Sequence, residues 1–113
     1  MEPEVRPYIT PEIEKRRHRR TQLVTQVRCD ALSREELLLT RDVSVGGMFV
    51  TAKDPFPPES DVVLSFTLRG GDAPLTARGK VVYSLRGMGM GIAFVDLSEE
   101  ARQALQKFVD EAI

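Results

Sequence analysis

The sequence predicts a mainly β protein: a six-stranded antiparallel β-barrel with a C-terminal α-helix and a flexible N-terminal arm. Six short segments have the composition of strands, and in two of them apolar and polar side chains alternate. Clusters of glycine, proline and aspartate separate these segments, and the last segment repeats apolar side chains at helical spacing. A chain of 113 residues is long enough for one domain with a modest core. We expect residues 1–14 to form the arm and residues 15–113 the folded domain.

The arm contains little that could fix it to a core. Met1–Ile9 carries two prolines and two glutamates with few apolar side chains, which is typical of a mobile segment. Thr10 and Pro11 are residue types favoured at the N-cap and at the first position of a helix. We therefore expect a short helix that ends near Arg17, although an isolated helix of this length is marginal.

The first half of the domain has three predicted strands, Gln22–Cys29, Glu36–Ser44 and Met48–Ala52, with a polar turn at 32–35 after the first. In the first strand, the alternation predicts that Leu23, Val27 and Cys29 face the core. Gln26 and Arg28 should then face solvent.

The second half has three more predicted strands, Asp61–Leu68, Leu75–Leu85 and Gly87–Asp96. A proline-rich loop at 54–58 precedes them, because proline cannot serve a central ladder, and Gly70-Gly71-Asp72 is a hairpin signal. In the long middle strand, Arg78, Lys80 and Ser84 are expected on one face. The core face should carry Leu75, Ala77, Val81, Tyr83 and Leu85.

Ser98 is expected to cap the final helix. Glu99 and Glu100 would lie in its first turn, where negative charge interacts favourably with the helix dipole. An apolar stripe at helical spacing should pack against the sheet and consists of Ala101, Ala104, Leu105, Phe108 and Ala112.

Charge and cysteine content narrow the function. The formal net charge of −1 excludes attraction to nucleic acid over the whole surface, and five of the sixteen Lys and Arg residues lie between Lys15 and Arg20. The one cysteine, Cys29, excludes a disulfide framework and is expected to be a buried core residue. No segment resembles a signal peptide or a membrane span. We expect a cytoplasmic protein.

The sequence offers no set of residues that catalysis or metal binding would require. His18 is the one histidine, and a single histidine with a single cysteine cannot build a zinc site. Ser44 has no base beside it that could make it a nucleophile. The glycines at 87–91 have the wrong spacing for a dinucleotide motif and are expected to mark a turn where bulk is excluded. We expect no enzyme, no cofactor and no metal.

The first of two polar motifs is Asp42-x-Ser44-x-x-Gly47 at the end of a predicted strand. Residues two apart on a strand share a face, so Asp42 and Ser44 are expected to point the same way while the adjoining valines face the core. Gly46 and Gly47 are expected to form a tight turn, in which positive φ costs little and backbone can approach a ligand closely.

The second motif is Arg16-x-x-x-Arg20 within the basic segment Lys15–Arg20. Residues four apart lie on one side of a helical turn, so the two arginines are expected to close over the strand end as a pair of forked donors.

Together the two motifs resemble the two-part motif of PilZ domains, which are bacterial receptors for the second messenger cyclic di-GMP. The segment GGMFV at 46–50, the strands after it, GMGIAF at 89–94 and the final helix occur in the order that such domains use. Each motif alone arises readily by chance, but both in this order make the match specific. The resemblance extends over Lys15–Val109 and implies a PilZ-type barrel that binds cyclic di-GMP.

The resemblance also implies roles for particular residues. Arg16 and Arg20 would bind phosphate and the O6/N7 edge of guanine. Asp42 and Ser44 would hydrogen-bond other polar atoms of guanine, and Gly47 would leave room for the base.

Lys15, Arg17 and Gly46 complete the expected ligand site. Arg17 points away from the face that Arg16 and Arg20 share, so it should contribute less. Lys15 stands where many family members have arginine; lysine keeps the charge but lacks the planar fork, which leaves open whether one ligand or a stacked pair is bound. Arg19 stands where a proline is frequent.

Two other functions remain open on the sequence. One is a PilZ-like protein-interaction adaptor that binds no nucleotide. The other is a small RNA or DNA binder with a basic arm, which would need an exposed aromatic platform that the sequence does not offer. We expect a single-domain receptor, monomeric or weakly dimeric, that binds neither DNA nor RNA, does not insert into membranes, and signals through an unidentified downstream protein.

Overall fold

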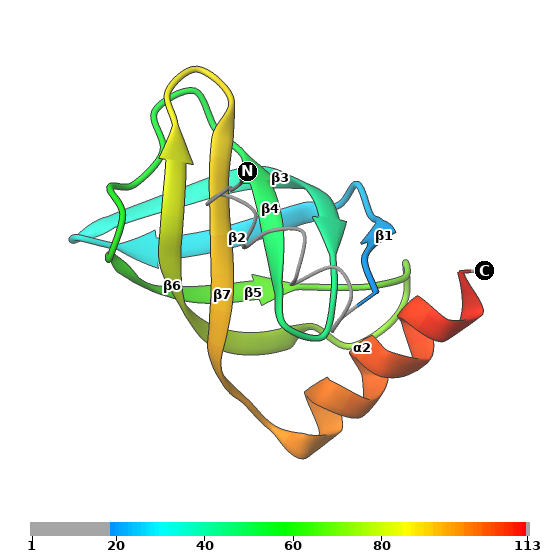
Figure 1. Cartoon of the computed structure of the whole chain (residues 1–113). Helices are drawn as coiled ribbons and strands as arrows, with labels where there is room; N and C mark the ends of the chain where they lie inside the picture. Colours follow the sequence, from blue (N-terminus) through cyan, green and yellow to red (C-terminus); the bar gives the residue numbers. More distant parts are fainter. Residues whose placement is uncertain (1–18, 113) are drawn as a thin grey trace, which may run out of the picture.

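The computed structural model describes residues 19–112, which form an antiparallel barrel with one helix against it (Figure 1). The elements are β1 Thr21–Gln22, β2 Gln26–Ala31, β3 Arg34–Val43, β4 Gly47–Thr51, β5 Asp61–Phe66, β6 Leu75–Leu85, β7 Gly89–Leu97 and α2 Glu99–Glu111. The strand order is β1-β3-β2-β5-β6-β7-β4, and a further pairing of β3 with β4 closes six strands into a barrel. The short β1 lies outside the closed ring. The predicted six-stranded barrel with a C-terminal helix is therefore confirmed.

The first predicted strand is divided in two, because the chain bends at residues 23–25. The buried hydroxyl of Thr40 organises this bend: its Oγ1 donates to the Leu23 carbonyl at 2.5 Å and accepts from the Thr25 amide at 3.0 Å. Leu23, Val27 and Cys29 face the core as predicted. The bend leaves β1 as a separate two-residue strand beside β3.

A two-residue turn joins β2 to β3. Leu32 and Ser33 both have positive φ, 51° and 60°, which matches the twist that tight hairpins require. The turn is shorter than the predicted segment 32–35, so β3 begins at Arg34 instead of Glu36.

The helix begins as predicted. Ser98 is the N-cap, and its side chain accepts from the Ala101 amide at 3.0 Å. The buried residues of α2 are Ala101, Leu105 and Val109, spaced four apart, and Leu105 belongs to the barrel core. Val109 was missed by the sequence analysis, while Ala112, predicted to be part of the stripe, is the exposed C-cap. Ala104 and Phe108 are partly buried against the core, as predicted.

The end of α2 is fastened to the β5–β6 connection by Arg69. Its guanidinium pairs with Glu111 at 2.6 Å and lies over the Phe108 ring at 5.0 Å from the centroid. In the part of the chain that the structure describes, no helix is long and apolar enough to cross a lipid bilayer.

Cys29 is fully buried on β2, and burial raises the pKa of its thiol from 9.0 to about 12, with smaller contributions from Asp30 and Glu36. The native protein should therefore resist iodoacetamide at pH 8, because the thiolate is the nucleophile. Mass spectrometry with and without guanidinium chloride measures this protection.

The same pKa shift predicts the direction of pH dependence. Because the native pKa lies above the unfolded value, the stability that Cys29 contributes is complete below about pH 9 and is lost as the pH rises toward 12. If iodoacetamide labels Cys29 in the native protein as fast as in the denatured protein, the barrel exposes this thiol.

Candidate functional site

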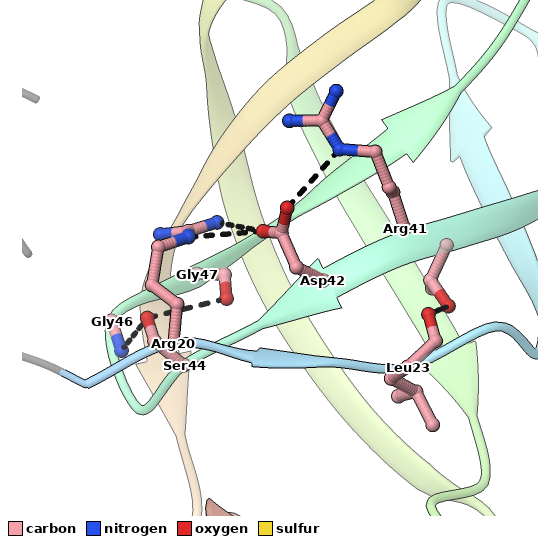
Figure 2. A network of polar contacts seen from close by, with 8 residues as sticks. Arg20, Leu23, Arg41, Asp42, Ser44, Gly46 and Gly47 are labelled. Carbon is pink, nitrogen blue, oxygen red and sulfur yellow. Dashed lines mark hydrogen bonds and ion pairs between the residues drawn. The ribbon is translucent and has the colours of Figure 1, made fainter.

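Arg20 of the basic motif meets Asp42 of the strand-end motif where the described chain enters the barrel. β1 pairs with the end of β3, with Thr21 opposite Val43 and Gln22 opposite Asp42, so Arg20 lies directly beside Asp42. Arg20 Nε and Nη2 both donate to Asp42 Oδ1, at 2.9 and 2.5 Å (Figure 2). Two residues separated by 22 positions in the sequence, one from each motif, thus form an ion pair on the outer face.

A β-bulge presents Asp42 to this surface. The register between β3 and β4 shifts between Thr40 and Asp42, so Arg41 is an additional residue in β3. Thr40 and Val43 are buried, whereas Arg41 and Asp42 both remain accessible between them. The bulge therefore places two charged side chains next to each other on one face, which strict alternation does not allow.

Arg41 contacts the other oxygen of the same carboxylate. Its Nε donates to Asp42 Oδ2 at 3.2 Å, so Asp42 lies between two guanidinium groups (Figure 2). The side chains of Arg20, Asp42 and Arg41 are 32%, 21% and 54% exposed. One carboxylate between two guanidinium groups leaves a local excess of positive charge, which favours an anionic ligand.

Ser44 lies just beyond the end of β3, and its hydroxyl is bonded within the β3–β4 turn. Its Oγ accepts from the Gly46 amide at 3.0 Å and donates to the Gly47 carbonyl at 3.5 Å, and the residue is 1% exposed. The hydroxyl therefore stabilises the turn, and a shared direction with the Asp42 side chain stays a prediction.

The predicted tight turn is present, with the Ser44 amide donating to the Gly47 carbonyl at 2.8 Å, but Gly46 and Gly47 do not use the positive φ that glycine allows. Gly47 is the first residue of β4 and pairs with Ala93 on β7. A Cβ at Gly47 would lie 2.1 Å from the Ile92 carbonyl oxygen. The missing side chain therefore makes room for the neighbouring strand.

Lys15, Arg16 and Arg17 lie outside the described residues, as do His18 and the predicted short helix. Their place in the ligand site stays a prediction. No group of three His, Cys, Asp or Glu side chains that could hold a metal ion occurs within residues 19–112.

A row of aromatic side chains that was not predicted from the sequence lies beside Asp42. Across the strands, Asp42 pairs with Phe49, Phe49 with Gly91, and Gly91 with Tyr83. Phe49 is 2% exposed but does not belong to the barrel core; Arg41 covers it with Cζ 3.9 Å from the ring centroid. The ring centroids of Phe49 and Tyr83 are 6.2 Å apart.

Two glycines on β7 allow these rings to lie against the sheet. A Cβ at Gly91 would lie 2.3 Å from the Tyr83 ring, and one at Gly89 would lie 2.8 Å from the Phe49 ring. The expectation that this glycine segment excludes bulk is confirmed.

Tyr83 and Leu85 face outward, although alternation along β6 placed them in the core. A register shift between Val81 and Tyr83 moves the later residues to the other face, and the two side chains are 42% and 43% exposed. The barrel thus has the exposed aromatic side chain that the sequence did not reveal.

The fold has known counterparts. The Bacillus subtilis inhibitor of motility (MotI/DgrA) matches with a TM-score of 0.75 at 18% identity, over 83% of this chain and 49% of that chain. This chain thus spans about half the length of that protein. The PilZ domain of Escherichia coli YcgR, determined with c-di-GMP, matches with a TM-score of 0.70 at 12% identity, over 87% of this chain and 91% of that domain.

A third structure, the PilZ domain of CeSA from a cellulose-synthesizing bacterium, has a TM-score of 0.61 at 20% identity, over 81% of this chain and 95% of that domain. A comparison with curated protein sequences gives no match. The family model described as PilZ domain matches residues 14–111, which include both motifs and every described strand. This chain therefore belongs to the PilZ domain family.

Proposed function

We propose that this protein binds cyclic di-GMP on the outer face of its barrel, where Arg20 meets Asp42. The observation that carries this proposal is their ion pair, because it brings one residue of each motif to a single point. Membership of the PilZ family and the likeness to a PilZ domain determined with c-di-GMP support the same ligand.

The chemistry of the ligand fits the residues proposed to bind it. Cyclic di-GMP carries two phosphodiester anions and two guanines. Arginine can donate two bonds to guanine O6 and N7 or to phosphate, and a carboxylate can accept from guanine N1 and N2. In this proposal Arg16 and Arg20 are the donors, Asp42 is the acceptor, and Lys15 and Arg17 add positive charge.

The β3–β4 turn forms the side of the proposed site. Ser44 Oγ is hydrogen-bonded within the turn, so it would have to rotate before it could reach guanine. We therefore expect Ser44 to contribute less to affinity than Asp42 does. Because Gly46 and Gly47 carry no side chains, the turn would leave room for the guanine base.

Binding would exchange one partner of Asp42 for another. Without ligand, Arg20 Nε and Nη2 both donate hydrogen bonds to Asp42 Oδ1. A guanine N–H would replace them, and Arg20 would turn to O6 and N7 or to a phosphate oxygen. Because Arg20 immediately precedes β1, its movement would carry the preceding chain with it.

Signalling follows from that movement in our proposal. The ligand would order the segment from about Thr10 to Arg20 over the barrel and create a surface for a downstream protein. We propose that this signalling occurs in the cytoplasm and that the protein is monomeric or weakly dimeric. It would act by binding and not as an enzyme. It would bind neither DNA nor RNA and would not insert into a membrane.

Isothermal titration calorimetry of the full chain with cyclic di-GMP tests the proposal, with GTP and a random oligonucleotide as controls. We expect saturable binding of cyclic di-GMP alone, with one or two ligands per chain. Hydrogen exchange of the same samples should show new protection over residues 10–20. Equal protection with and without ligand would leave a rigid receptor and remove the ordering step.

The alternative function is a protein-interaction adaptor that binds no nucleotide. It is favoured by one observation: both oxygens of Asp42 are already paired with arginine. If calorimetry detects no cyclic di-GMP binding while the protein remains folded, the adaptor function replaces the receptor function.

A further inference from the structure

Arg41 is held in a fixed position beside the proposed guanine acceptor. Its Cζ lies 3.9 Å from the centroid of the Phe49 ring, and its Nε donates to Asp42 Oδ2 at 3.2 Å. A guanidinium over an aromatic face that also hydrogen-bonds a carboxylate has little remaining freedom. The side chain is nevertheless 54% exposed, so a ligand can reach it.

Among residues 19–112, no hydrogen bond involves the two terminal nitrogens of Arg41. Nε makes the bond to Asp42, and Figure 2 shows the two terminal nitrogens on the side of the guanidinium away from the carboxylate. Arginine carries five N–H donors, and four of them are on these two nitrogens. The guanidinium of Arg41, a donor, thus lies directly beside the carboxylate of Asp42, an acceptor.

We propose that Arg41 selects guanine over adenine by donating to O6 while Asp42 accepts from N1 and N2. This inference rests on the proposed function and adds a specificity residue to it. On the Watson–Crick edge of guanine, O6 is an acceptor next to the N1 and N2 donors, so it needs a donor placed next to the carboxylate. Arg41 occupies that position.

Adenine presents the opposite pattern to the same pair. Its N6 amino group would face the donors of Arg41, and its N1 acceptor would face the carboxylate of Asp42. Both contacts would be unfavourable, because each buries a polar group opposite a group of the same kind. The Arg41–Asp42 pair therefore discriminates by repulsion as well as by attraction.

The test is calorimetry of Arg41→Ala and Arg41→Lys with cyclic di-GMP and cyclic di-AMP. Loss of one charge-assisted hydrogen bond should weaken cyclic di-GMP binding about ten- to a hundredfold. Binding of cyclic di-AMP should change less than about threefold, so discrimination narrows. Arg41→Lys should recover only part of the loss, because lysine keeps the charge but does not stack flat on Phe49.

Arg69→Ala is the matched control. Arg69 also lies over an aromatic ring and pairs with a carboxylate, but it does so at the end of α2. Its substitution should leave both affinities unchanged.

The outcomes separate this inference from the proposed function. If wild type binds cyclic di-GMP and Arg41→Ala binds it equally well, Arg41 does not contact the ligand and the receptor function stands. If Arg41→Ala lowers the affinity for both dinucleotides by the same factor, Arg41 supplies charge but not specificity, which also overturns the inference. If wild type binds neither dinucleotide, the receptor function fails and the inference fails with it.

Discussion

Asp42→Ala should weaken cyclic di-GMP binding by about a hundredfold or more without unfolding the barrel. The substitution removes the proposed acceptor for two guanine N–H groups, and a hydrogen bond to a charged group is worth roughly 1.5–3 kcal/mol. It also leaves the guanidinium groups of Arg20 and Arg41 without the carboxylate that they share. Calorimetry with cyclic di-GMP measures the loss.

Stability is expected to change little in the same variant. Both ion pairs of Asp42 are partly exposed, and pairs of that kind contribute about 0–1 kcal/mol. Asp61→Ala is the matched control, since Asp61 pairs with Lys80 at 3.2 Å on another part of the barrel. Absence of a cooperative thermal transition in Asp42→Ala would assign Asp42 a structural role.

Gly47→Ala should lower the stability of the domain by about 1–3 kcal/mol or more, which is the usual cost of overpacking. The added Cβ would lie 2.1 Å from the Ile92 carbonyl oxygen and 3.1 Å from Ala93 Cα. Both atoms are backbone, so β4 and β7 would have to separate at this pair. Differential scanning calorimetry should show a Tm lower by roughly 5 to 20 °C.

Gly70→Ala is the control for this substitution. A Cβ at Gly70 would meet no atom within 4 Å, so stability should stay within about 0.5 kcal/mol of wild type. If Gly47→Ala instead melts like wild type but loses cyclic di-GMP binding, the glycine acts at the ligand and not between the strands.

The strands and the helix could be predicted because their patterns are local. The long strand Leu75–Leu85 has the predicted bounds, and Ser98 caps the helix as expected. Side-chain alternation and N-cap preference depend on neighbouring residues, which a sequence displays directly.

The outer face could not be predicted to the same extent, because β-bulges depend on the partner strand. The shift after Val81 turned Tyr83 outward, and the additional residue Arg41 came to lie beside Asp42. Nothing within either strand marks these positions. The turn bonds of Ser44 could not be predicted for a related reason, since β3 ends one residue before it and strand alternation no longer applies there.

The attachment of β1 has a practical consequence for optical sensors. β1 is joined to β3 through the pairs Thr21 with Val43 and Gln22 with Asp42, so the chain enters the barrel at the proposed ligand site itself. The far end of α2, in contrast, is fastened through Arg69 and Glu111. If ligand binding moves Arg20 as proposed, a fluorophore placed before Arg20 would report occupancy, and one placed after α2 would serve as the stationary reference for energy transfer.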